Sequence, residues 1–323
     1  MVRRERNTTV SAATARSRLP ILAAASLLLS LGLFSCSINR FAISMVSNAL
    51  SSGSSTSTFT SDNDPALVGN ALPFALKLYE VLVAQDPKNA RLLLTTGTLF
   101  VVYAEAYLQQ PADMLPDTEY KKQEALRHQA KLLYLRGRDY VMRGLEIRHP
   151  DFRGGLKGEA LAKQLASMTK ADVPYLFWAA AGWAGAYAIN PFDFKLAVTI
   201  REPVAMMQRA RELDPAFQNG AIPDFFISYY GAAPSALGGS IAKAKEAFNQ
   251  AVAVTKGLSP APYVAYAQYI SVAEHDRSGF EEMLKKALAI DPNAVPDNRL
   301  ETLLSQQKAR WLLDNVGKFF LSP

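Results

Sequence analysis

The chain has 323 residues, of which 49% are hydrophobic and 20% charged, and its formal net charge is +6. The first 35 residues carry five arginines and one glutamate, so they hold +4 of that charge and leave +2 for the remainder. Because the remainder has no basic block, nucleic acid is not an expected partner. A single cysteine also excludes an intramolecular disulfide framework.

The N-terminus predicts a lipoprotein signal peptide over residues 1–35. Arginines come first, and an apolar core from Leu19 to Phe34 follows, shorter than the roughly 20 apolar residues of a comfortable transmembrane helix. The core ends in Leu33-Phe34-Ser35-Cys36, which looks like a bacterial lipobox, although Phe34 stands where a small residue is usual. We expect cleavage before Cys36 and acylation of its thiol with fatty acids such as palmitate. A plain signal anchor or an ordinary cleaved signal is the alternative.

Residues 36–61 are expected to form the lipid anchor and a tether. The stretch SSGSSTSTFTS at 51–61 has too few apolar side chains to fold and predicts a flexible segment. Buried acyl methylenes, at about 0.8 kcal/mol each, would hold the N-terminus at a membrane. Ser37 follows the cysteine where an aspartate would signal retention in the inner membrane. The expected location is therefore the periplasm, with the lipid anchored in the outer membrane.

Residues 62–323 predict one helical domain. Asp64 is a good N-cap and Pro65 a good first helical residue, so a helix is expected to begin there. Apolar residues then recur at helical spacing, and no alternating strand pattern of convincing length interrupts them. The fold class is all-α. The ranges expected to be helical after Pro65 are 71–85, 91–109, 117–148, 157–168, 173–189, 194–213, 223–231, 240–256, 261–274, 277–290 and 298–319.

Several of these helices share one kind of ending. The pairs Asp86-Pro87, His149-Pro150 and Asp214-Pro215 lie 63 and 65 residues apart, and proline blocks the continuation of a helix. Those intervals suit two repeats of about 34 residues each. The stretches AKAKEAFNQAV and GFEEMLKKALAIDPNA resemble tetratricopeptide helices. We expect an array of antiparallel helix pairs resembling degenerate tetratricopeptide repeats, similar to an α-solenoid.

The segment PYLFWAAAGWAGAYAI at 174–189 contains no charge. A membrane span is one interpretation, but sixteen residues is short for a span. Gly182 and Gly185, with several alanines, form a small-residue face that suits close contact between helices. We therefore expect a buried helix.

Aromatic residues are more abundant in this segment and in FFISYY at 225–230 than close packing needs. Tyrosine and tryptophan combine an apolar body with a polar edge, which suits a pocket for an organic acid or a lipid-like molecule. Ordinary core packing is the alternative. The candidate ligand-binding residues are Trp178, Trp183, Tyr187, Asn190, Tyr229 and Tyr230.

No catalytic or metal-binding constellation is found in the sequence. The three histidines have no companion at ligand spacing, and no metalloprotease, hydrolase, Walker or dinucleotide motif is present. We expect neither an enzyme nor a cofactor or metal. The stretch ALGGS at 236–240 could hold an anion at a helix N-terminus, or Ser240 could simply cap that helix.

Three blocks resemble a known family, the TatT proteins, which are the T-components of tripartite ATP-independent periplasmic (TRAP) transporters. The blocks are SDNDPALVGNALPFALKLYEVL, PYLFWAAAGWAGAYAI and YYGAAPSALGGSIAKAKEAF, in the same order as in the family, and the similarity runs from about Thr60 to the end of the chain. The resemblance implies a periplasmic lipoprotein of cryptic tetratricopeptide-like helix pairs. It also implies a homotrimer whose protomers each surround a pore or cleft.

The implied function is that of an accessory protein. Together with a periplasmic solute-binding protein it would bind or pass a small organic ligand, for which a hydrophobic organic acid is one candidate. The alternative is an outer-membrane-tethered tetratricopeptide scaffold that binds peptide or protein partners in envelope assembly.

Overall fold

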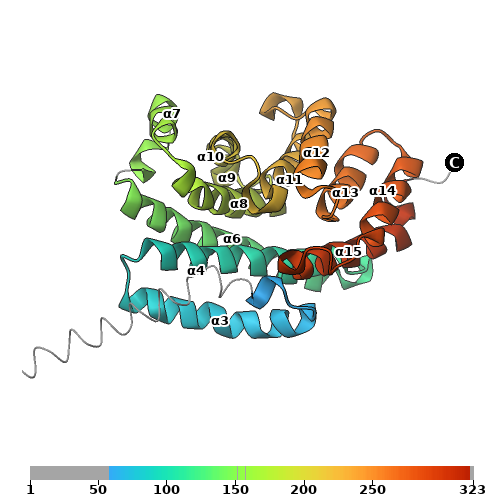
Figure 1. Ribbon diagram of the computed structural model, residues 1–323, viewed down its shortest axis with the longest axis horizontal. Coiled ribbons are helices and arrows are strands. Elements are labelled where there is room, and N and C mark those ends of the chain that lie inside the picture. Colours follow the sequence, from blue (N-terminus) through green and yellow to red (C-terminus); the bar gives the residue numbers. More distant parts are fainter. Residues whose placement is uncertain (1–57, 151, 157, 321–323) are drawn as a thin grey trace, which may run out of the picture.

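The computed structural model describes residues 58–150, 152–156 and 158–320. Within those ranges the regular elements are helices and none is a strand, so the all-α prediction is confirmed (Figure 1). Cys36, the signal peptide predicted over 1–35 and most of the predicted tether lie outside the described residues.

The α-helices follow one another along the chain with short connections. They are α3 (Pro65–Gln85), α4 (Ala90–Ala104), α5 (Gln110–Met114), α6 (Tyr120–Arg148), α7 (Gly158–Ala166), α8 (Val173–Ile189), α9 (Phe194–Ala197), α10 (Arg201–Leu213), α11 (Phe217–Ala232), α12 (Ile241–Thr255), α13 (Ala261–Ala265), α14 (Arg277–Ala289) and α15 (Arg299–Asp314). Two π-helices interrupt the series, η1 (Glu105–Gln109) between α4 and α5, and η6 (Tyr266–Ser271) after α13.

Local signals set many of the helix ends. The Asp64 carboxylate accepts hydrogen bonds from the amides of Ala66 and Leu67, each at 3.0 Å, and so caps α3 as predicted. Ser240 caps α12 by accepting from the Lys243 amide at 3.4 Å. The helices α3, α6 and α10 each end one residue before an Asp-Pro or His-Pro pair, because proline cannot continue a helix. The predicted N-cap at Asp64 and the predicted helix ends before Pro87, Pro150 and Pro215 are confirmed.

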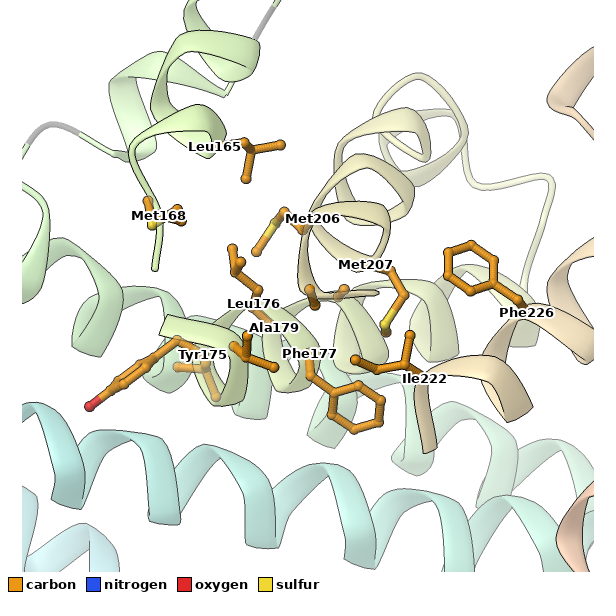
Figure 2. Packing of buried hydrophobic residues seen from close by; sticks show 14 of the residues in the cluster. Leu165, Met168, Tyr175, Leu176, Phe177, Ala179, Met206, Met207, Ile222 and Phe226 are labelled. Atoms are coloured by element: carbon orange, nitrogen blue, oxygen red, sulfur yellow. The ribbon is translucent and has the colours of Figure 1, made fainter. Parts of the chain in front are cut away.

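The helix α8 is buried between its neighbours. It packs against α6 on one side and α10 on the other, and Figure 2 shows Leu176 and Phe177 of α8 close to Met206 and Met207 of α10. A Cβ atom at Gly182 would lie 2.9 Å from the carbonyl oxygen of Tyr134 in α6. The glycine therefore lets the two backbones approach closely, and the prediction of a buried helix with a small-residue face is confirmed.

The last long helix returns to the first ones. In Figure 1, α15 crosses beside the helices near the start of the chain, and it contacts both α3 and α5. Leu300 joins the cluster of buried side chains from α3 and α4. The Gln110 side chain donates to the Leu304 carbonyl at 3.0 Å, and Arg299 donates to the Ser61 carbonyl at 3.1 Å. The array of helices therefore closes into a ring of contacts, which we call the helical ring.

Several predicted ranges differ in detail, and the range 91–109 includes the π-helix η1. The range 194–213 divides into α9 and α10, with a turn at residues 198–200. The range 261–274 contains the π-helix η6. The helix expected at 223–231 lies in α11, whose residues 218–220 have left-handed backbone angles, so the continuous right-handed helix starts after Gly220.

Among the described residues, two stretches are long and apolar enough to span a membrane by length and composition alone, Pro65–Gln85 and Ala90–Met114. The second is half buried in the helical ring. The first, α3, is 28% buried over its most apolar window. It presents an outward stripe of exposed apolar side chains, Leu67, Phe74, Leu78 and Val81.

Candidate functional site

Three carboxylates gather where the helical ring closes. Glu105 is the first residue of η1, Asp224 lies in α11 and Glu301 lies in the first turn of α15. They are close enough to act on one another electrostatically, and Lys308 of α15 acts on Glu105 and Asp224. We call these four residues the acidic recess.

The pKa values of the three carboxyls in the acidic recess are raised. Burial, together with the charges of Glu301 and Glu105 and against the effect of Lys308, raises the pKa of Asp224 to about 7. Burial and the charge of Glu105 raise the pKa of Glu301 to about 7. Burial also raises the pKa of Glu105, against the effect of Lys308. Near neutral pH such groups both donate and accept hydrogen bonds.

The acidic recess is partly exposed to water. Glu105 and Glu301 are exposed residues, yet loss of hydration is the main cause of their raised pKa values. Among the described residues, one carboxyl oxygen of Asp224 is buried and has no hydrogen-bond partner. An unpaired buried oxygen is costly, so a polar group entering the recess would relieve that cost.

Tyr134 of α6 lies close enough to Glu105 to be influenced by its charge. The Tyr134 hydroxyl donates to the Gln109 side-chain oxygen at 2.7 Å. Burial, followed by the charge of Glu105, raises the pKa of Tyr134 well above its usual value. The hydroxyl is therefore neutral at physiological pH, and it fixes the side chain of the π-helix residue Gln109.

A second hollow lies between α10, α11 and α12. It has two connected parts of about 290 and 250 Å³ that share Gln208, Tyr230 and Lys243. Arg211 and Glu246 line the first part, and Arg201 and Tyr229 line the second. We call this hollow the cationic groove, defined by Arg201, Gln208, Arg211, Tyr229, Tyr230 and Lys243.

The cationic groove holds two of the predicted ligand-binding residues. Tyr229 and Tyr230 line it, and their rings lie 5.5 Å apart. The hydroxyl of Tyr229 donates to the Leu237 carbonyl. The Lys243 ammonium lies 5.7 Å from the centre of the Tyr230 ring. The structure thus brings these two tyrosines to one concave surface, next to cations that the sequence analysis did not identify.

The other four predicted ligand-binding residues line neither part of the cationic groove. Trp183 is buried, and its indole N–H donates to the Thr199 hydroxyl at 3.2 Å. Trp178 is half-buried and packs edge-on against Phe177 at 5.1 Å. Asn190 ends α8 and accepts from the Phe192 amide at 3.2 Å. Tyr187 is half-buried and close enough to Tyr229 to influence it electrostatically.

Sequence reasoning missed the acidic recess, although two of its members carry a signal. Glu105 is the sole charged residue between Arg91 and Asp113, and Asp224 is the sole charged residue between Asp214 and Lys243. A lone carboxylate inside an apolar helix is expensive to bury, so it marks a place with a specific role. Glu301 has charged residues nearby in the sequence and carries no such signal. In the described residues, no group of histidine, cysteine, aspartate and glutamate side chains is placed to hold a metal ion.

Comparison with known proteins gives two findings. Residues 61–320 match the family model described as "TRAP transporter T-component". An uncharacterized protein of Treponema pallidum (strain Nichols) is 37% identical over 301 residues, which cover 88% of this chain and 93% of the relative.

Proposed function

The chain belongs to the family of TRAP transporter T-components, and on that premise we propose that it is a lipid-anchored periplasmic accessory protein that binds or passes a small organic ligand together with a solute-binding protein. Family membership itself implies association with components of a TRAP transporter, and a periplasmic or membrane-associated location. The family is that of a transporter component and not an enzyme family. The anchor, the ligand and the specific partner belong to the proposal.

The observation that carries the ligand part of the proposal is the acidic recess. Its carboxyls come from three separate elements, meet water, and include an oxygen of Asp224 without a partner in the described residues. A protein with only a structural role has little reason to gather partly desolvated carboxyls, since burying them costs stability. The arrangement suits a site that exchanges hydrogen bonds with a passing solute.

The lipid anchor is supported by the sequence around Cys36 and by the position of the domain behind it. Residues 58–60, inside the Ser/Thr-rich stretch, are helical, and Phe59 packs against the buried side chains of α3 and α4, so the tether predicted over 36–61 is wrong at its end. A tether over the residues before 58 would still separate the acylated residue from the helical ring. Replacing Cys36 by alanine is expected to release the protein from membranes in fractionated cells. Unchanged fractionation of Cys36→Ala would refute the anchor.

The choice of the outer membrane depends on Ser37. In the wild-type protein the lipid anchor is expected to co-fractionate with outer-membrane markers. The Ser37→Asp variant is expected to move to the inner membrane. Identical distribution of the two proteins would remove the argument for the outer membrane while leaving the anchor itself in place.

A pull-down tests the partner. The tagged protein, extracted in detergent, is expected to recover the solute-binding protein of a TRAP transporter, and repeated failure would contradict the proposal. Mass spectrometry of the purified protein under native conditions separates the ligand function from the scaffold alternative. A retained small organic molecule supports transport, and retained peptides support a scaffold. The same spectra measure the homotrimer that family resemblance implies.

A matched pair of variants ties the ligand to the acidic recess. Glu301→Gln removes one carboxylate of the recess, and it is expected to change the amount of retained small molecule while leaving recovery of the partner intact. Glu282→Gln is the control, because Glu282 is an exposed residue of α14 that pairs with Lys286. Equal retention by both variants would place the ligand elsewhere.

A further inference from the structure

The cationic groove has more positive than negative side chains. Arg201, Arg211 and Lys243 line it, against the single carboxylate of Glu246. Eighteen pairs of oppositely charged side chains lie within ion-pair distance in the described residues, and none includes Arg201, Arg211 or Lys243. These three are therefore available to an anion from outside.

Aromatic rings hold two of the cations in place. The Arg211 guanidinium lies 4.5 Å from the centre of the Phe226 ring, which is fully buried. The Lys243 ammonium lies 5.7 Å from the centre of the Tyr230 ring. Cation–π contacts of this kind orient a charged group without neutralising it. The positive charges are thus fixed in direction and keep their attraction for an anion.

Hydrogen bonds connect two of the segments that line the groove. The Ser240 amide donates to the Tyr230 carbonyl at 2.9 Å, and the Tyr229 hydroxyl donates to the Leu237 carbonyl. These bonds tie the loop before α12 to the end of α11. The first turn of α12 contains no acidic residue, so the partial positive charge at its N-terminus adds to the attraction for an anion.

The groove also offers an apolar surface beside the charges. Val204 and Ala205 of α10 line the part that contains Tyr229. A hollow with apolar and aromatic walls and a few oriented polar groups is typical of a small-molecule site. Its two parts, of about 290 and 250 Å³, suit a compact organic molecule.

We propose that the cationic groove binds a small organic anion, with a carboxylate held by Arg211 and Lys243 and an apolar body lying against Tyr229, Tyr230 and Val204. This inference rests on the proposed function, because it names the chemical class and a binding place for the ligand that the solute-binding protein shares. Near neutral pH the carboxyls of the acidic recess are partly protonated and can donate hydrogen bonds to the same carboxylate.

Calorimetric titration with three probes tests the proposal: phenylacetate, its cationic counterpart phenethylamine and the neutral 2-phenylethanol. Phenylacetate is expected to bind more tightly than either of the others, since charge-assisted hydrogen bonds to a carboxylate are the strong ones. Octanoate and acetate extend the series. Binding that rises from acetate to octanoate would support the apolar wall, and no binding by any of the three carboxylates would overturn the proposal.

Substitutions of the cations in the groove test where phenylacetate binds. Lys243→Gln and Arg211→Gln are each expected to weaken phenylacetate binding about tenfold or more. Lys245→Gln is the matched control on the same helix, because Lys245 pairs with Glu274 and does not line the groove. Lys243 is exposed, so its replacement leaves the fold intact even where Arg211→Gln lowers stability through lost contact with Phe226. Equal weakening by Lys245→Gln, or none by Lys243→Gln, would overturn the proposal.

The pull-down distinguishes this failure from failure of the proposed function. Lys243→Gln is expected to keep the solute-binding protein while losing phenylacetate. A variant and a wild-type protein that both recover the partner, with neither binding a carboxylate, would refute the groove and keep the accessory role. Absence of the partner from the wild-type pull-down would refute the accessory role itself.

Discussion

Gly97 of α4 and Gly137 of α6 face each other where the two helices cross. A Cβ atom at Gly97 would lie 2.5 Å from the Gly137 carbonyl oxygen, and a Cβ atom at Gly137 would lie 2.7 Å from the Gly97 carbonyl oxygen. Both distances are shorter than any ordinary carbon–oxygen contact. The two backbones can approach this closely because neither residue has a side chain.

Replacing Gly97 by alanine is therefore expected to destabilise the protein. The added methyl group would meet backbone atoms that cannot move aside, and overpacking of this kind typically costs about 1–3 kcal/mol. Urea unfolding followed by circular dichroism measures the change. Gly317→Ala is the control, because nothing lies within 4 Å of the Cβ position there. Similar losses in both variants would contradict the close crossing.

Stability should fall as the pH rises toward neutrality. The pKa of Asp224 is about 7 in the folded protein, against 3.8 as its ordinary value, so the folded state holds more protons than the unfolded state between these limits. Stability from this source is complete below about pH 4 and is lost as the pH passes about 7. The pKa of Glu301 is also raised, to about 7, so its contribution to stability is likewise lost as the pH rises.

The Asp224→Asn variant tests this pH dependence. It is expected to reduce the loss of stability between about pH 5 and 8 by on the order of 1 to 2 kcal/mol, after allowance for solvent contact. Melting temperatures over that range provide the measurement. Glu282→Gln, on the exposed surface of α14, is expected to leave the profile unchanged. A wild-type protein more stable at about pH 8 than at about pH 5 would contradict the assignment.

Asp172 should have the opposite pH dependence. Burial alone would raise its pKa, but hydrogen bonds from the Thr169 amide, His149, Arg148 and the Thr169 hydroxyl outweigh burial and lower the pKa to about 2. The Arg148 side chain donates to Asp172 at 2.8 Å. A lowered pKa stabilises the fold above the ordinary value of 3.8, and this contribution is lost as the pH falls from about 4 to about 2.

Asp172→Asn is accordingly expected to cost about 2–3 kcal/mol near neutral pH, because the charge-assisted bonds to Arg148 and His149 are lost. It should also flatten the loss of stability in acid. Asp139→Asn is a suitable comparison, since half of the Asp139 side chain is exposed. An acid profile that is the same for wild type and Asp172→Asn would show that other carboxylates govern acid unfolding.

Leu300 should connect the two ends of the described chain energetically. It is 6% exposed and packs among buried residues of α3 and α4, so Leu300→Ala is expected to cost about 2–4 kcal/mol. Hydrogen exchange should accelerate in α3 as well as in α15, because α15 covers part of α3. Leu132→Ala, at a side chain 53% exposed, is the comparison. Faster exchange confined to α15 would argue against the closed ring.

The helix ends could be predicted because their causes lie within a few residues. Proline after Asp86, His149 and Asp214 prevents a further helical turn whatever surrounds it, and Asp64 caps the next residues in its own chain. The break inside 194–213 was not predicted. Thr199, at that break, accepts from Trp183 of α8 and donates to the carbonyl of Lys195, so a contact from another helix takes part.

Some residues of the cationic groove could be predicted from the sequence and others could not. Tyr229 and Tyr230 could be predicted as members of a concave surface because adjacent aromatic residues are conspicuous in the sequence. Arg211 could not, because one arginine in an amphipathic helix looks like any other solvated charge. Only packing against Phe226 and the absence of a carboxylate within ion-pair distance in the described residues distinguish it.

The sequence by itself determined that the protein is a series of helices, where many of them begin and end, and which helix is too apolar to lie on the surface. These properties depend on backbone geometry and hydrophobic spacing over a few residues. The tertiary structure alone decided that α15 returns to α3 and α5, and that Glu105, Asp224 and Glu301 meet there. Electrostatic and hydration energies depend on distance in space, and residues 105 and 301 become neighbours only when the ring closes.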